Sequence, residues 1–124
     1  MLNNRQTLGK QGEEIAENYL KKNKYKILEK NYKNRYGEID IIAQKNKKII
    51  FIEVKTRYNL KFGPPEESVN ITKQIKIIRS AEKYILSNKL KKDYRIDVIA
   101  IKIKKDKFYQ KIQLKHLKSA IKYF

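Results

Sequence analysis

Apolar residues recur at helical spacing in two stretches of the chain. In residues 8–23 they form one face, made of Leu8, Ile15, Ala16, Tyr19 and Leu20, so we predict a helix there. Residues 1–7 are polar and are expected to form a flexible tail. A second helix is predicted over residues 71–87, with Asn70 as its N-cap. Its expected apolar face consists of Ile71, Ile75, Ile78, Ala81 and Ile85.

Strand-like patterns of β-branched and aromatic residues occupy four other segments, which are 25–33, 38–45, 48–57 and 94–103. Residues 108–114 are expected to add an edge strand, and residues 115–123 a short final helix. The stretch LKFGPPEES, residues 60–68, holds Gly and two Pro and is expected to be a loop.

The order of these elements predicts an α/β domain with an α-β-β-β-α-β core. The first three strands should form an antiparallel meander. The helix over 71–87 should be a right-handed crossover that returns residues 94–103 parallel to residues 48–57. The result is a mixed central sheet flanked by helices, and residues 1–124 are expected to form this single domain.

Ionisable residues interrupt the two most strand-like segments, which flank a turn at residues 46–47. With an even-length loop there, Lys45 faces Lys48 and Asp40 faces Glu53. Glu38 then faces Lys55. Because strand side chains alternate between faces, Glu38, Asp40, Glu53 and Lys55 should form one patch. A loop of odd length would shift this register by one residue.

Like charges directly opposite each other destabilise a sheet, so Asp40 and Glu53 need a compensating cation. Lys55 can supply it, which makes the patch a structural ion cluster. A divalent metal ion can supply it as well, because Mg²⁺ binds one or two carboxylates and keeps several waters. The residues alone leave both interpretations open.

The charge of the chain narrows the class of partner. Thirty-one basic and 13 acidic residues give a net charge of +18, which favours a nucleic acid or another polyanion. The absence of Cys excludes disulfides and thiolate metal sites. No apolar run reaches the length of a membrane span and the N-terminus is polar, so we expect a cytoplasmic protein without a membrane partner.

Asp40, followed after twelve residues by Glu53-Val54-Lys55, resembles the motif of the PD-(D/E)xK nuclease superfamily, with Glu13 upstream. The chain is further identified as similar to the YraN-like uncharacterised bacterial family, and to the Holliday-junction-resolvase branch of that superfamily. The segments that carry this resemblance are GEEIAENYL (12–20), NYKNRYGEIDIIA (31–43), IFIEVKTR (50–57), FGPPEESV (62–69), KQ (73–74) and YRIDVIAI (94–101).

The resemblance implies a restriction-endonuclease-like fold and a metal-dependent site. Asp40 and Glu53 would be the metal ligands, Lys55 the catalytic lysine, and Glu13 the helical carboxylate that completes the site. Ile39 stands where the superfamily motif has Pro. The expected cofactor is Mg²⁺ or Mn²⁺.

Several other residues have two interpretations. Gln74 and Glu38 are candidate auxiliary site residues. The alternative for Gln74 is burial with hydrogen-bond partners, and the alternative for Glu38 is a salt bridge to Lys55 or Arg57 or a role in orienting the turn. Arg57, Arg35 and Lys73 are candidate phosphate contacts, and a solvated face is the alternative. Two further residues are expected to be structural. Asp97 is expected to act as a cap or to pair with Arg95 or with a helix, and His116 is expected to be a surface or capping residue.

The function expected from these features is hydrolysis of DNA phosphodiesters by an endonuclease, on branched or junction DNA if the resolvase resemblance extends to the substrate. A homodimer would suit paired cuts in a symmetric junction. The alternatives are a basic nucleic-acid-binding protein without hydrolytic activity, and an RNA- or ribosome-associated protein whose acidic patch is structural.

Overall fold

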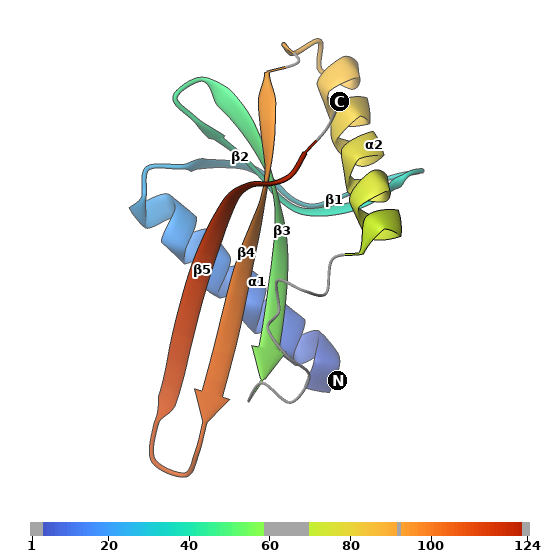
Figure 1. Cartoon of the computed structure of the whole chain (residues 1–124). Coiled ribbons are helices and arrows are strands. Elements are labelled where there is room, and N and C mark those ends of the chain that lie inside the picture. The colour runs from blue at the N-terminus through green and yellow to red at the C-terminus, as the bar shows by residue number, and fades with distance from the viewer. Residues whose placement is uncertain (1–3, 59–69, 92, 123–124) are drawn as a thin grey trace.

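A computed structural model describes residues 4–58, 70–91 and 93–122 (Figure 1). Its elements follow in the order α1 (Asn4–Lys22), β1 (Lys26–Asn34), β2 (Gly37–Lys45), β3 (Lys48–Tyr58), α2 (Ile71–Ser87), β4 (Tyr94–Lys105) and β5 (Gln110–Ile121). The loop predicted over residues 60–68 lies outside the described residues. Of the described helices, neither is long and apolar enough to cross a membrane.

The five strands form one mixed sheet in the order β1-β2-β3-β4-β5. β1, β2 and β3 are antiparallel neighbours, β4 returns parallel to β3, and β5 is antiparallel to β4. The predicted α/β class and the predicted meander with its parallel return strand are therefore confirmed.

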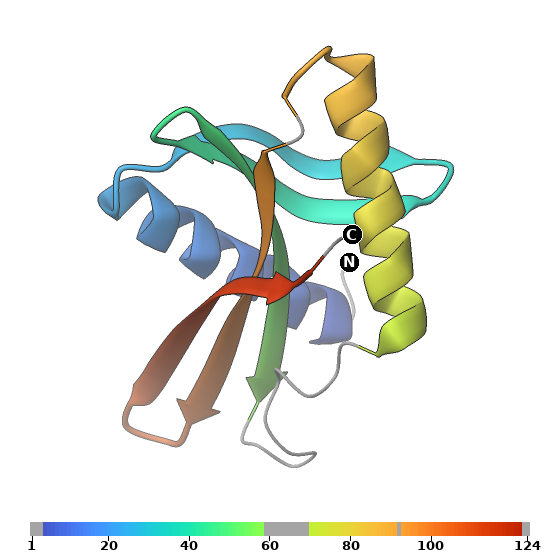
Figure 2. The ribbon, with the colours of Figure 1, turned by 45° about the horizontal axis from the view of Figure 1, so that its top comes forward.

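The two helices cover opposite faces of the sheet (Figures 1 and 2). Under α1 lies a core that includes Ala16, Leu20, Ile50, Ile52 and Ile101. Under α2 lies a second core that includes Ile39, Phe51, Ile77, Tyr84 and Ile96. Because β3 contributes alternate residues to both cores, it is buried on both sides over residues 49–53.

The helix predicted over residues 115–123 is wrong, because β5 runs through this segment to Ile121. Its residues continue the pairing with β4, with Leu117 opposite Val98. Ser119 adopts a left-handed backbone (φ 53°) at an irregularity of the register. This lets the strand absorb extra residues and still place Ile121 opposite Ile96.

The flexible tail predicted over residues 1–7 is also wrong for its described part, because α1 begins at Asn4. No Gly or Pro interrupts residues 4–8, and Arg and Gln are good helix formers, so the helix continues past the apolar face that predicted it. Residues 1–3 lie outside the described part.

α2 has the predicted bounds, and the Asn70 side chain caps it by accepting a hydrogen bond from the Lys73 N–H at 2.9 Å. Its buried stripe is rotated from the predicted one, because Ile71 and Ile75 are exposed. The helix instead buries Ile77, Ala81 and Ile85. At about 100° per residue this stripe passes near Gln74, which is half-buried.

Candidate active site

The predicted register of the β2–β3 hairpin is confirmed along its paired length. Backbone pairing runs from Lys45 opposite Lys48 to Ile41 opposite Ile52. Within the described strands it ends there, one residue before Asp40 and Glu53. The Asp40 carboxylate Oδ2 instead accepts a hydrogen bond from the Val54 N–H at 2.8 Å. A side-chain oxygen thus joins the two strands where their backbones stop pairing.

β2 bends at Asp40, and the bend changes which side chains share a face. Ile41 packs in the core under α1, whereas Ile39 packs in the core under α2. Regular alternation would place both on the same face. Asn31, which lies between the partners of these two residues on β1, has a left-handed backbone (φ 53°). This bend is the reason that the expected four-residue patch is not formed as predicted.

The ion pairs at the bend also differ from the predicted ones. Lys55 pairs with Glu53 on its own strand, with Lys55 Nζ 3.4 Å from Glu53 Oε1. Lys73, in the first turn of α2, approaches the same oxygen at 3.1 Å. The expected contact between Glu38 and Lys55 is therefore replaced, and Glu38 is exposed.

We call Asp40, Glu53, Lys55 and Lys73 the group at the bend. Glu53 is its buried centre, with 6% of its surface exposed. A carboxylate is costly to bury unless cations or hydrogen bonds compensate it. Two ammonium groups do so here, one from β3 and one from α2. Sequence reasoning treated Lys73 as a phosphate contact or a solvated residue, because local sequence does not specify where the first turn of α2 lies relative to β3.

The pKa of Asp40 is raised to about 7. Burial is the largest cause, followed by the negative charge of Glu53, while the hydrogen bond from Val54 opposes the shift. Glu13 and Glu38 raise it further. Asp40 therefore holds a proton more tightly than an ordinary carboxyl and lies in a local excess of negative charge.

Glu13 of α1 belongs to the same electrostatic environment. Its pKa is raised by burial and by the charges of Glu38 and Glu53, and Lys30 opposes the shift. The sequence-predicted carboxylates Glu13, Asp40 and Glu53, which come from a helix and two strands, are thus near enough to influence one another electrostatically. Such crowding is typical of sites that bind a cation or move a proton.

Gly12 allows α1 to approach β3 this closely. A Cβ at this position would overlap the Oγ1 atom of Thr56 and come within 3.0 Å of its Cβ. The backbone of α1 therefore rests directly on β3, one residue before Glu13. A glycine inside an otherwise helical pattern was the signal that could have predicted this contact.

The two lysines at Glu53 differ in their affinity for a proton. Burial lowers the pKa of Lys55, and the neighbouring Lys73 lowers it further. Burial also opposes charge on Lys73, but its contacts with Lys55 and Glu53 raise its pKa overall. Lys73 therefore holds its proton more tightly than Lys55 does.

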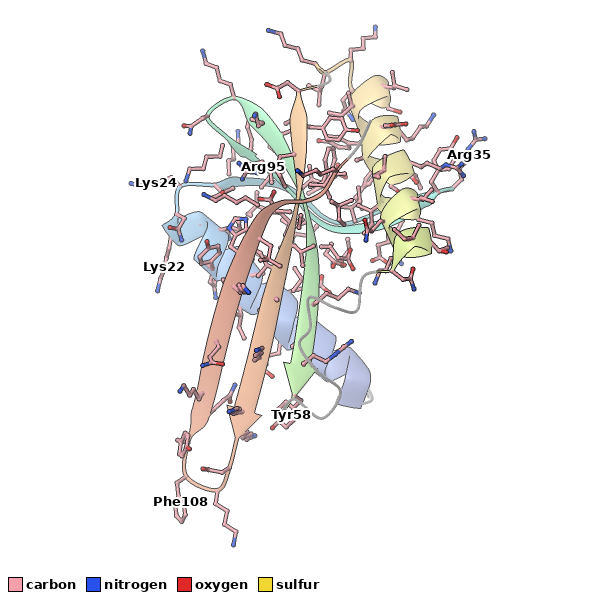
Figure 3. All side chains as sticks on the ribbon, viewed as in Figure 1. Lys22, Lys24, Arg35, Tyr58, Arg95 and Phe108 are labelled. Carbon is pink, nitrogen blue, oxygen red and sulfur yellow. The ribbon has the colours of Figure 1, made fainter. Side chains whose placement is uncertain are left out.

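The remaining predicted residues are placed as follows. Arg57 lies two residues beyond Lys55 on β3, and its Nη1 donates to the Thr56 carbonyl at 3.4 Å. Its Nε is buried and has no hydrogen-bond partner among the described residues. Gln74 follows Lys73 in α2 and is half-buried. Its auxiliary role in the site stays a prediction. Arg35 stacks on Tyr36 at the β1–β2 turn, at the margin of the molecule and outside the group (Figure 3).

Asp97 and His116 form a separate buried network. Asp97 accepts hydrogen bonds from Arg95 Nε at 2.8 Å and from the Ser119 N–H at 2.9 Å. His116 Nε2 lies 2.7 Å from Asp97 Oδ2, and its Nδ1 lies 2.9 Å from the hydroxyl of Tyr19. The structural pairing predicted for Asp97 is confirmed. The surface position predicted for His116 is wrong, because a buried carboxylate holds its ring beneath β5.

The residues at the bend suit a hard divalent cation. Among the described residues, no three His, Cys, Asp or Glu side chains form a ready metal-binding group. The chain would therefore supply the two carboxylates of Asp40 and Glu53 and leave the other positions to water and phosphate oxygens. This oxygen-only, water-rich ligand set is typical of Mg²⁺ and acceptable to Mn²⁺.

Comparison with known proteins identifies relatives over most of the chain. A family model described as "Uncharacterised protein family UPF0102" matches residues 12–101. A UPF0102 protein of Thermodesulfovibrio yellowstonii is 55% identical over 100 residues, which cover 79% of this chain and 88% of that protein. A UPF0102 protein of Clostridium botulinum is 46% identical over 117 residues, which cover 93% of each. The region matched by the family model contains Glu13, Asp40, Glu53, Lys55 and Lys73.

Proposed function

We propose, from the premise that this chain belongs to the UPF0102 family, that it is a divalent-metal-dependent endonuclease that hydrolyses DNA phosphodiesters. The observation that carries the proposal is that Asp40 and Glu53 lie next to the point where β2 and β3 stop pairing and influence each other electrostatically, with Lys55 Nζ 3.4 Å from Glu53 Oε1. The order of these residues also supports membership of the PD-(D/E)xK nuclease superfamily.

Asp40 and Glu53 would hold the Mg²⁺ or Mn²⁺ ion, with Glu13 assisting directly or through water. When bound, such an ion stabilises negative charge on a phosphate oxygen and favours ionisation of a water molecule. The raised pKa of Asp40 and the burial of Glu53 both favour binding of a cation, because a cation relieves the repulsion between these carboxylates.

Lys55 is the group that acts on the attacking water in this proposal. Its lowered pKa favours the uncharged amine, which is the form that can accept a proton. The water oxygen bonds to phosphorus, its proton passes to Lys55, and the bond from phosphorus to the leaving oxygen breaks. The leaving oxygen takes a proton from solvent.

Lys73 and Arg57 have supporting roles in this proposal: Lys73 contacts Glu53, and Arg57 binds a phosphate of the substrate. Lys73 Nζ lies 3.1 Å from Glu53 Oε1, and its raised pKa favours the ammonium form that makes this contact. The buried Nε of Arg57 has no partner among the described residues, and a guanidinium suits bidentate contact with a phosphate. The net charge of +18 supplies further affinity for the backbone.

One observation favours a second candidate function. Glu53 already has two lysine partners, so the charge of this carboxylate is compensated without a metal ion. The second candidate is therefore a basic nucleic-acid-binding protein that does not hydrolyse its ligand. Both candidates place the chain in the cytoplasm with its nucleic acid, and a homodimer would suit a symmetric four-way junction.

A substrate panel distinguishes the two candidates. It consists of linear, nicked, flapped and four-way-junction DNA, each incubated with Mg²⁺, Mn²⁺ or EDTA. The nuclease proposal predicts cleavage with either metal and none in EDTA, with preference for a branched member of the panel. Tight binding of every DNA without cleavage of any supports the second candidate instead.

A further inference from the structure

The β4–β5 hairpin extends beyond the rest of the described structure. Its strands remain paired as far as Lys105 and Gln110, and residues 106–109 form the turn. Figure 1 shows the hairpin reaching past the end of β3 and past α1, and Figure 3 shows Phe108 at its tip. The turn and the last strand residues of this hairpin can therefore contact a partner from several sides.

The tip carries two aromatic rings that contribute little to the folded core. Phe108 is 90% exposed and Tyr109 is 63% exposed. Phe108 is the most exposed large hydrophobic residue among those described. An apolar ring held in water gains nothing for folding, and such residues at a projecting tip are typical of contacts with a partner.

Hydrogen bonds to Asp106 fix the turn that presents these rings. The Asp106 Oδ1 accepts hydrogen bonds from the N–H groups of Phe108 and Tyr109, at 2.8 and 3.0 Å. The Asp106 N–H donates to the Tyr109 carbonyl at 3.1 Å. The backbone that bears the rings is therefore ordered before any partner binds, which reduces the entropy lost on binding.

Positive charge surrounds the two rings. Four exposed lysines lie within four residues of Phe108: Lys104, Lys105, Lys107 and Lys111. A hollow of about 130 Å³ at the turn is lined by Lys104, Lys105, Asp106 and Tyr109. Aromatic rings set among lysines suit a ligand with flat apolar faces on an anionic backbone, which is the chemistry of an unpaired nucleic acid strand.

The strand register relates the tip to the candidate active site. Glu53 lies opposite Val98, and Lys105 lies seven residues farther along β4. At about 3.3 Å per residue, the tip begins about 23 Å from the level of Glu53. This length corresponds to about seven base pairs at the rise of about 3.4 Å along the axis of duplex DNA, and to fewer nucleotides of an extended single strand. A single DNA molecule can therefore contact both regions.

We infer that Phe108 and Tyr109 stack on unpaired bases of DNA, so that the hairpin selects single-stranded or branched segments about 23 Å from the level of the phosphodiester at the site. The inference rests on the proposed DNA-directed function. A continuous duplex offers the rings no free base face, because neighbouring base pairs cover it. The lysines contact phosphates in either case, whereas the rings discriminate between paired and unpaired DNA.

The test compares affinities for a single strand, a four-way junction and a continuous duplex, all measured in EDTA so that no cleavage occurs. The variant is Phe108→Ala/Tyr109→Ala. The matched control is Leu86→Ala, which removes a side chain that is 66% exposed on α2. The double variant should lose on the order of 10-fold or more in affinity for the single strand and the junction. Its affinity for the duplex should change less than about twofold, as should all affinities of Leu86→Ala.

Quenching of 2-aminopurine placed along the single strand provides a second readout. It should occur with the parent chain and be lost in the double variant, since stacking on a ring quenches this base. Equal losses of affinity on all three DNAs would overturn the inference, and so would unchanged affinities. Binding of the parent to vesicles of anionic lipid through the same rings, without selectivity among the DNAs, would also overturn it.

The outcomes separate this inference from the proposed function. If the parent binds DNA and the tip variant behaves like it, the inference fails and the nuclease proposal is unaffected. If the tip variant loses selectivity but the parent cleaves nothing in the substrate panel, the inference stands and hydrolysis fails. If the parent binds no DNA, both fail.

Discussion

Asp40 lies where the backbone pairing of β2 with β3 ends and a side-chain hydrogen bond joins the two strands instead. Its carboxylate accepts the Val54 N–H, and the strands cease to pair at the same point. The partial separation of the strands gives Asp40 and Glu53 access to a shared partner. Lys55 is next to this opening and not on a solvated face, which distinguishes it from most of the 31 basic residues.

Lys55→Ala should therefore lower kcat on the order of 10²-fold or more, with little change in DNA affinity, because the amine acts mainly in the transition state. Lys48→Ala is the matched control, since it removes a lysine from the same strand that pairs with the exposed Asp93. The measurements are single-turnover cleavage with Mg²⁺ and DNA binding in EDTA. Cleavage by Lys55→Ala at the parent rate would show that the lysine is only a salt partner of Glu53.

The pH dependence of stability tests the environment of Asp40. Because its pKa rises from 3.8 to about 7 on folding, the native state binds the proton more tightly. The stability contributed by the proton is present below pH 4 and is lost as the pH rises through 7. In EDTA, Asp40→Asn should therefore become more stable than the parent as the pH approaches 8, and this advantage should vanish near pH 4.

Urea denaturation midpoints from pH 4 to 8 measure this difference. Glu14→Gln, which changes an exposed carboxylate on the same protein, is the control and should show no such trend. Parallel curves for Asp40→Asn and the parent across the whole range would contradict the buried, crowded environment of Asp40.

At the scale of elements, the site depends on how closely α1 lies on β3. Gly12→Ala introduces a methyl group that overlaps Thr56 Oγ1, so the helix or the strand must shift. We expect a loss of about 1–3 kcal/mol in the free energy of unfolding. We also expect lower activity, because Glu13 moves with the helix.

Gly9→Ala is the matched control for this prediction. It lies in the same helix with no atom within 4 Å of its added Cβ, and it should stabilise the helix by up to about 1 kcal/mol. Thr56→Ala in the Gly12→Ala background should recover part of the loss, because it removes the closest atom. Equal effects of the two glycine substitutions would show that helix propensity, and not the contact with β3, accounts for the result.

The elements themselves were largely predictable from hydrophobic period, and the hairpin register from its even-length turn. The bend at Asp40 was not, because it depends on a left-handed Asn31 on the neighbouring strand and not on any pattern within β2. The same holds for the end of β5, where a buried contact between His116 and Asp97 stabilises a strand over residues with helical spacing. Lys73 joined the site through the tertiary position of α2, which local sequence does not specify.

At the scale of the whole molecule, charge and shape act together. The net charge of +18 should make DNA affinity fall steeply with salt and vary little with base sequence, because phosphate contacts dominate. Binding of several unrelated duplexes between 50 and 200 mM salt, roughly the range over which such contacts weaken strongly, measures both effects. A flat plot of log K against log salt, or strong preference for one linear sequence, would contradict this expectation.

The most direct test of the central claim is the rate of DNA cleavage by the purified chain as a function of free Mg²⁺ and Mn²⁺. Asp40→Asn and Glu53→Gln, purified in parallel, reveal any contaminating nuclease. The account predicts a parent rate that is zero in EDTA and saturates with either metal, and no cleavage above background by either variant. Cleavage that survives in EDTA, or that persists unchanged in Asp40→Asn, would contradict a metal site built on these two carboxylates.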